Sequence, residues 1–180
     1  MEKRIALQQY GKHLWTRERA KQIRSSVQEA LDSLRAGDIV VLDLDGVEVF
    51  DYSFANELFG KTLLSLANEY PGRFVVVENL TDYTRENLAK ALESLGLAIA
   101  VRKRSKFELL GKVHPSDVDT FGALAGSKEP LSATELSKKL DVNLTAMNER
   151  LTKLGNMGLV RREKAASTAG REQFRYRALA

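Results

Sequence analysis

The chain has 180 residues, with 28 Lys and Arg against 24 Asp and Glu, 43% hydrophobic residues and no cysteine. This length allows one domain or two small ones, and the composition is that of a globular protein with a buried core. The lack of cysteine excludes disulfide scaffolds, thiolate metal sites and thiol nucleophiles. No apolar run approaches the roughly 18 residues of a membrane span, and the N-terminus has no signal-like segment. We therefore expect a cytoplasmic protein without metal or other cofactors.

The positive charge is concentrated near the C-terminus. Residues 1–115 carry 17 basic and 16 acidic side chains, whereas residues 142–180 carry 8 basic and 3 acidic ones. The hydrophobic pattern changes in the same region, from alternating strands and helices to two helices followed by two strands. This pattern predicts two domains, at residues 1–114 and 115–180.

The first part alternates short apolar runs with longer amphipathic stretches. The run DIVVLDL at residues 38–44 is nearly continuous, as expected of a strand that is covered on both faces. Strands that alternate with helices in this way predict one mixed α/β sheet. The predicted strands are residues 4–9, 38–44, 73–77, 97–102 and 107–113, and the predicted helices are residues 16–35, 53–70 and 81–95.

The second part begins with a short predicted helix at residues 116–125. A second helix at residues 131–140 has Ser132 as a candidate N-cap, and Glu135 completes a capping box three residues later. A tight turn leads to a third helix, which ends near residue 156 and for which Asn143 is a suitable cap. Two strands are predicted to follow, at residues 159–163 and 172–179.

Two helices joined by a tight turn and followed by a hairpin are the parts of a winged helix-turn-helix domain. The string LSATELSKKLDVNLTAMNERLTKLGNMGLVRRE at residues 131–163 resembles the winged-helix domains of bacterial transcription regulators such as the MarR and ArsR families. The resemblance implies binding to double-stranded DNA. It also implies a homodimer, because such regulators often bind two half-sites.

The resemblance also implies which side chains meet DNA. In the third helix, the expected groove-facing residues are Leu144, Thr145, Asn148, Glu149 and Thr152, with Arg150 and Lys153 beside them. Near the hairpin, the expected phosphate-binding residues are Arg161, Arg162, Lys164, Arg171, Arg175 and Arg177. Strand alternation places Phe174 and Tyr176 on the core side and the neighbouring guanidinium groups outside. Two alternatives stay open: the basic residues form an ordinary solvated surface, or the module binds protein instead of DNA.

A second resemblance covers roughly residues 10–113. The segments GVEVFDYSFANELFGK at residues 46–61 and TRERAKQI at residues 16–23, with the strand between them, resemble the STAS-like family, which is related to anti-sigma-factor antagonists. In those antagonists, a partner kinase of the histidine-kinase-like ATPase fold phosphorylates a serine after the central strand. Ser53 takes the place of that serine, although Tyr52 and Phe54 depart from the family's Ser and Gly. The alternative is that Ser53, or Asp51, simply caps the helix.

Asp43 and Asp45 offer a competing enzyme hypothesis. The segment DLDGV at residues 43–47 resembles the first motif of haloacid-dehalogenase-type phosphatases, in which the first Asp is a nucleophile and Mg²⁺ assists. The later lysine and acidic pair of that family have no counterpart here. We therefore expect no enzyme, and the phosphatase stays a remote alternative.

Together these observations predict an α/β protein. A STAS-like mixed sheet with helices is followed by a C-terminal winged helix-turn-helix domain. The predicted function is transcriptional regulation through DNA, with a protein partner or phosphorylation as the input. The main alternative is a partner-switching protein that does not bind DNA.

Overall fold

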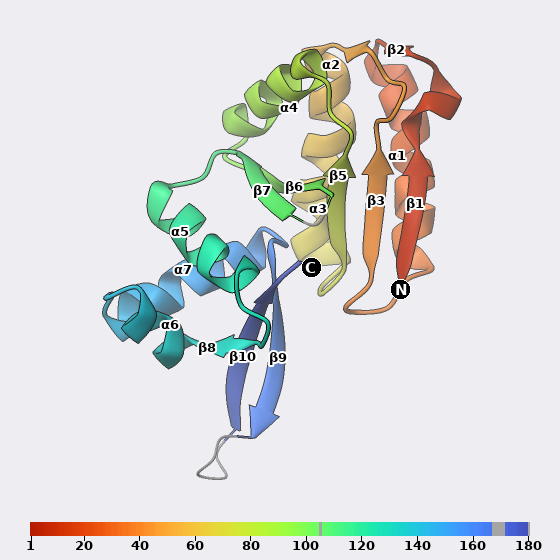
Figure 1. The fold of residues 1–180 in the computed structure, drawn as a ribbon. Helices are drawn as coiled ribbons and strands as arrows, with labels where there is room; N and C mark the ends of the chain where they lie inside the picture. The colour runs from red at the N-terminus through yellow and green to blue at the C-terminus, as the bar shows by residue number, and fades with distance from the viewer. Residues whose placement is uncertain (105, 167–171, 180) are drawn as a thin grey trace. The chain divides into compact units, whose positions relative to one another are not determined.

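The computed structural model describes residues 1–104, 106–166 and 172–179 (Figure 1). The chain forms two compact units, Met1–Val113 and His114–Ala180. Within the described residues, no helix combines the length and the apolar character that crossing a membrane requires.

The first unit is built on a five-stranded sheet in the order β1-β3-β5-β6-β7. The first four of these strands are parallel, and β7 runs antiparallel to β6. A small parallel ladder joins β2 to β4. The strands are β1 (Glu2–Ala6), β2 (His13–Leu14), β3 (Ile39–Asp43), β4 (Val49–Phe50), β5 (Phe74–Glu78), β6 (Ala98–Lys103) and β7 (Lys106–Gly111). The helices are η1 (Leu7–Tyr10), α1 (Arg17–Asp32), α2 (Tyr52–Ala55), η2 (Asn56–Gly60), α3 (Lys61–Glu69) and α4 (Asp82–Ser94).

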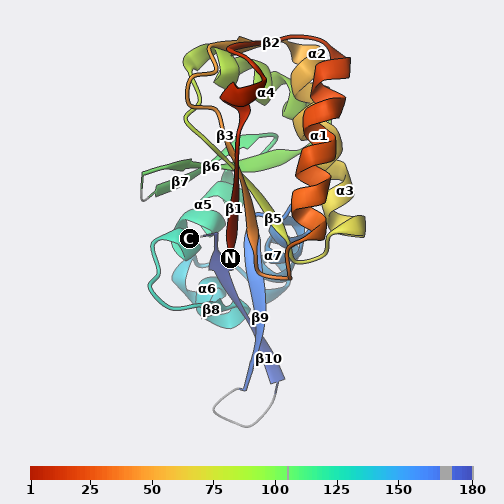
Figure 2. The same ribbon diagram turned by 90° about the vertical axis from the view of Figure 1, so that its right-hand side faces the viewer.

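The strand order explains where the helices lie. Each parallel connection moves one strand further in the same direction, and right-handed crossovers of this kind place their helices on one face. Figures 1 and 2 show α1 and α3 on the same side of β1, β3 and β5. Alternate strand residues such as Val40, Leu42, Val75 and Val77 belong to the core cluster formed with these helices. The mixed α/β sheet predicted from the sequence is therefore confirmed.

The long helical segment after β4 contains a π-helical turn, η2. Glu57 lies in this turn and is only 2% exposed. Its carboxylate forms ion pairs with Lys61 (Nζ to Oε2, 2.7 Å) and with Arg24 (Nη2 to Oε1, 3.2 Å). Because a buried carboxylate is costly unless it is paired, these two cations stabilise the ionised form.

The described residues of the second unit form three helices and a three-stranded antiparallel sheet in the order β8-β10-β9. Its elements are α5 (Pro115–Ala125), β8 (Leu131–Ser132), α6 (Ala133–Lys139), α7 (Leu144–Asn156), β9 (Val160–Ala166) and β10 (Glu172–Ala178). Ser132 caps α6 through a capping box with Glu135, as the sequence predicts. Asn143 caps α7 by accepting a hydrogen bond from the N–H of Ala146 at 2.8 Å, also as predicted.

Three features differ from the sequence-based prediction. The first strand occupies Glu2–Ala6 instead of residues 4–9, because Leu7–Tyr10 turns into a 3-10 helix. The helix predicted over residues 53–70 is interrupted by the π turn, in which the four consecutive residues from Glu57 to Gly60 are all buried. The strands β2, β4 and β8 have two residues each, too few to show an alternating pattern.

Candidate nucleic-acid interface and charged cluster

Helix α7 presents a polar outward face. Its buried side consists of Met147, Leu151 and Leu154, each at most 1% exposed. The predicted groove-facing residues, which we call the outward face, are all exposed: Leu144, Thr145, Asn148, Glu149 and Thr152. Leu144 retains 46% exposure, and Glu149 is the only charged member of this group. The outward face therefore offers hydrogen-bonding groups and one negative charge, but no cation.

The two cations of α7 are directed toward α5. Lys153 donates to the carboxylate of Asp117 at 2.6 Å, and Asp117 is 4% exposed. Arg150 lies with Nη1 at 3.5 Å from the carbonyl oxygen of Ser116. The sequence assigned Arg150 and Lys153 to the flanks of a DNA site, whereas the structure gives them partners within their own unit.

The β9–β10 hairpin has an exposed basic and aromatic surface. Arg162, Lys164, Phe174 and Tyr176 share one alternation of the paired strands with Glu172, and we call these four residues the hairpin face. The guanidinium carbon of Arg162 lies 4.3 Å from the centre of the Phe174 ring, which is cation–π geometry. Phe174 was predicted to lie on the core side, but it is 39% exposed. Strand β8 pairs only with Arg175 and Tyr176, so Phe174 lies beyond the end of this third strand.

The residues on the other alternation of the hairpin contact neighbouring parts of their own unit. Arg175 donates from Nη1 to the carbonyl oxygen of Pro130 at 2.8 Å and lies 3.6 Å from the carboxylate of Glu135. Arg177 is paired with Arg161 across the strands, and both are half-buried. Arg175, which was predicted to face outward, therefore has partners within its own unit. Arg171, also predicted to bind phosphate, lies outside the described residues.

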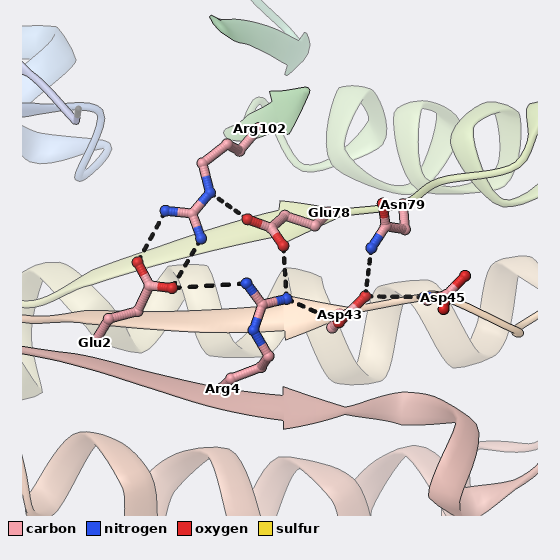
Figure 3. Close-up of polar contacts among 7 residues, drawn as sticks. All are labelled: Glu2, Arg4, Asp43, Asp45, Glu78, Asn79 and Arg102. Atoms are coloured by element: carbon pink, nitrogen blue, oxygen red, sulfur yellow. Dashed lines mark hydrogen bonds and ion pairs between the residues drawn. The ribbon is translucent and has the colours of Figure 1, made fainter. Parts of the chain in front are cut away.

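A cluster of charged side chains joins four parallel strands of the first unit (Figure 3). Arg4 on β1 donates from Nη1 to Asp43 at 2.8 Å and to Glu78 at 2.6 Å. Arg102 on β6 binds both carboxylate oxygens of Glu2 at 2.8 Å and also donates to Glu78 from Nε. Two arginines thus hold three carboxylates, and the five side chains have a net charge of −1.

Hydrogen bonds lower the pKa values of Glu2 and Asp43 in this cluster. The Arg102 hydrogen bonds lower the pKa of Glu2 below its ordinary value. For Asp43, burial favours the neutral acid, but donors from the Asp45 N–H, the Asn79 amide and Arg4 outweigh burial and lower its pKa. These carboxylates are therefore ionised at neutral pH and stabilise the folded state.

Acid should destabilise the first unit through these groups. A carboxylate with a lowered folded pKa contributes stability above its unfolded pKa of about 4, and this contribution is lost as the pH falls through the folded pKa. We expect the free energy of unfolding to fall between about pH 5 and pH 3 in urea titrations followed by Trp15 fluorescence. The variant Asp43→Asn should show a shallower decline. A free energy that stays constant over this range would contradict the expectation.

Ser53 is not the cap of its helix. Asp51 caps α2 by accepting a hydrogen bond from the N–H of Phe54 at 2.7 Å, so the structure selects Asp51 from the two caps that the sequence allowed. Ser53 is half-buried in the first turn of this short helix.

Both carboxylate oxygens of Asp43 accept hydrogen bonds. Its Oδ1 accepts from Asn79 and from the N–H of Asp45, and its Oδ2 accepts from Arg4. Among the described side chains, no three His, Asp or Glu lie close enough together to hold a metal ion.

Sequence reasoning missed the arginine–carboxylate cluster and the Arg162–Phe174 pair. The cluster has a weak signal, because Asp43, Glu78 and Arg102 each follow an apolar run at a strand end. Glu2 and Arg4 join it only through the strand order, which the sequence does not reveal. The Arg162–Phe174 pair depends on the hairpin register, which requires the loop length and turn.

Comparisons with known proteins agree with part of this description. Residues 20–84 match the model of the STAS-like domain of unknown function (DUF4325), which confirms the STAS-like prediction for this segment. None of the curated proteins matches the chain. A solved structure described as a possible transcriptional regulator, from Methanosarcina mazei Go1, has 13% identity and a TM-score of 0.35. That match covers 45% of this chain and 74% of the other.

Proposed function

We propose that this chain is a DNA-binding transcriptional regulator with a STAS-like input domain and a C-terminal winged helix-turn-helix domain. The observation that supports it most directly is the order α5, β8, α6, α7, β9, β10 with an antiparallel β8-β10-β9 sheet. This order supplies a bracing helix, a tight turn, a second helix and a hairpin, which are the parts that such domains place against DNA.

The dimensions and surface of α7 support this proposal. Its 13 residues correspond to about 20 Å of helix, and the major groove is about 12 Å wide and accepts an α-helix. Thr145 and Asn148 lie on the exposed side near the capped N-terminus. Their side chains would make hydrogen bonds to base edges or phosphates.

A partner-switching protein without DNA binding is the second candidate. The 46% exposure of Leu144 and the acidic Glu149 favour protein contact over phosphate contact on α7. In either case the proposed input is a protein partner at the STAS-like unit, with Ser53 as the phosphorylation candidate. Phosphopeptide mapping after incubation with a histidine-kinase-like ATPase and ATP, with Ser53→Ala as control, tests this input.

No catalytic step is part of the proposal. We assign Asp43 a structural role, because its carboxylate oxygens already accept hydrogen bonds from Arg4, Asn79 and the Asp45 N–H. Asp45 lies in the same turn, and its backbone N–H donates the last of these hydrogen bonds.

Fluorescence anisotropy with a labelled pool of genomic duplex fragments tests the DNA-binding function. We expect binding that weakens steeply between about 50 and 200 mM salt, because bound cations displace counterions from the phosphates. Asn148→Glu places a negative charge on the exposed side of α7 and should weaken binding about tenfold through phosphate repulsion. Gln22→Glu makes the same charge change on an exposed position of α1 and should have little effect. Absent or salt-independent binding by the unmodified protein would reject the function.

A further inference from the structure

We infer that Asp117, at the start of α5, holds Lys153 of α7 away from DNA and thereby keeps the affinity for duplex DNA low. This inference rests on the proposed DNA-binding function and adds an internal restraint to it. The ammonium group of Lys153 donates to the carboxylate of Asp117 at 2.6 Å; Asp117 is buried, whereas nearly half of the Lys153 side chain is exposed. A buried carboxylate is costly to leave without a partner, so the fold favours the paired state.

Lys153 lies at a point of α7 where a cation would matter for binding DNA. It directly follows Thr152 of the outward face, and it is four residues after Glu149, the negatively charged member of that face. Side chains at this spacing are neighbours on a helix, and a glutamate followed by a lysine is a favourable order. The ammonium group of Lys153 is nevertheless bound to Asp117 on another helix. The negative charge of Glu149 therefore faces outward while Lys153 is withheld.

The first turn of α5 contacts the other cation of α7 as well. The carbonyl oxygen of Ser116 lies 3.5 Å from Nη1 of Arg150. Both contacts come from the turn that His114 caps, in which its Nδ1 accepts a hydrogen bond from the N–H of Ser116. This turn directly follows Val113, the last residue of the first unit. The restraint on α7 therefore lies in the part of the second unit that is nearest along the chain to the STAS-like unit, which is where an input from that unit would enter.

Release of Lys153 should raise the affinity for DNA. Its four-carbon side chain is flexible and ends in a compact charge, so without Asp117 it can turn toward the outward face and meet a phosphate. A lysine–phosphate contact releases counterions, which raises the affinity and steepens the slope of log affinity against log salt by about one. Such a contact carries no sequence information, so the gain should be similar for all duplexes. Asp117 therefore determines how tightly the chain binds, and not which sequence it selects.

The test compares variants of the full chain by fluorescence anisotropy with a labelled DNA duplex of mixed sequence. Asp117→Asn removes the negative charge at almost unchanged size, so it should strengthen binding about fivefold and steepen the salt slope by about one. Asp117→Ala also removes the hydrogen-bond acceptor and should strengthen binding at least as much. Asp119→Asn is the matched control, because it makes the same charge change at an exposed position of α5. It should change the affinity by less than about twofold and leave the slope unchanged.

Lys153→Met shows whether Lys153 is the source of the gain. In the unmodified chain it should change the affinity by less than about twofold, because Lys153 is not free to contact phosphates there. Combined with Asp117→Asn, it should abolish the gain in affinity and in slope. This double variant replaces both members of the pair, so it leaves no buried charge without its partner.

Nitrogen-15 NMR of the lysine ammonium groups provides a measurement that does not depend on DNA. The ammonium protons of Lys153 should exchange with water more slowly in the unmodified chain than in Asp117→Asn, because the charge-assisted hydrogen bond restrains the group. Equal exchange in the two proteins would show that Asp117 does not hold Lys153 in solution, and it would overturn the inference.

The outcomes distinguish this inference from the proposed function. If the unmodified chain binds DNA with an affinity that Asp117→Asn and Asp117→Ala leave unchanged, the function stands and the inference is wrong. A gain that Asp119→Asn reproduces, or that persists when Lys153→Met is added, would be an effect of net charge and would also overturn the inference. If neither the unmodified chain nor Asp117→Asn binds DNA, the proposed function fails and the inference fails with it. Circular dichroism of each variant verifies that the fold is retained.

Discussion

Replacing Gly111 by alanine should destabilise the first unit by about 3 kcal/mol or more. Gly111 ends β7 with φ of +116°, a backbone conformation that residues with a Cβ rarely adopt. An added Cβ would lie 2.4 Å from the carbonyl oxygen of Leu97 and 3.0 Å from the Cα of Ala98. Both of these atoms belong to the backbone of the adjacent β6 region, so the strand pair itself would have to move apart.

Urea unfolding followed by Trp15 fluorescence measures this loss, since the single tryptophan lies in the same unit. Gly155→Ala in α7 of the second unit is the control and should leave the Trp15 midpoint unchanged. Nothing lies within 4 Å of the added Cβ at that position, and an alanine in a helix is more favourable than a glycine by about 0.5–1 kcal/mol. A Gly111→Ala protein with the same urea midpoint as the unmodified protein would show that β6 and β7 accommodate the methyl group.

Local sequence signals predicted the helix boundaries well. The caps Ser132 and Asn143 act within one turn of chain, so their hydrogen bonds depend on few other residues. The apolar runs around Val40 and Val75 predicted central strands because burial on both faces excludes polar residues. These features depend on residues that are close in the chain.

Features that depend on residues far apart in the sequence were harder to predict. Alternation placed Phe174 on the core side of its strand, but it could not show that the core ends before this residue, which is 39% exposed. Lys153 looked available for DNA because the sequence does not show that the carboxylate of Asp117 is buried beside it. Fewer basic side chains of the C-terminal unit are therefore available to DNA than the charge count suggests.

Removing the Arg102 side chain should also lower the free energy of unfolding strongly, because this residue connects strands that lie far apart in the sequence. Its guanidinium group, 19% exposed, bridges Glu2 and Glu78. Without it, Arg4 alone would face Glu2, Asp43 and Glu78. Leaving carboxylates without their partner in a partly buried site costs more than an exposed ion pair contributes, so we expect Arg102→Met to lower the free energy of unfolding by about 2–3 kcal/mol.

Arg85→Met is the matched control, since Arg85 also pairs with a carboxylate, that of Glu108, but both partners are about one-third exposed. This variant should lose less than about 1 kcal/mol. Adding Glu78→Gln to Arg102→Met should recover part of the loss, because it removes one of the carboxylates that lack a partner. The resulting coupling energy should be about 1 kcal/mol or more. If the two substitutions were simply additive, the cluster would be a set of independent surface pairs, and its charges would not hold the edge strand β1 to β5 and β6.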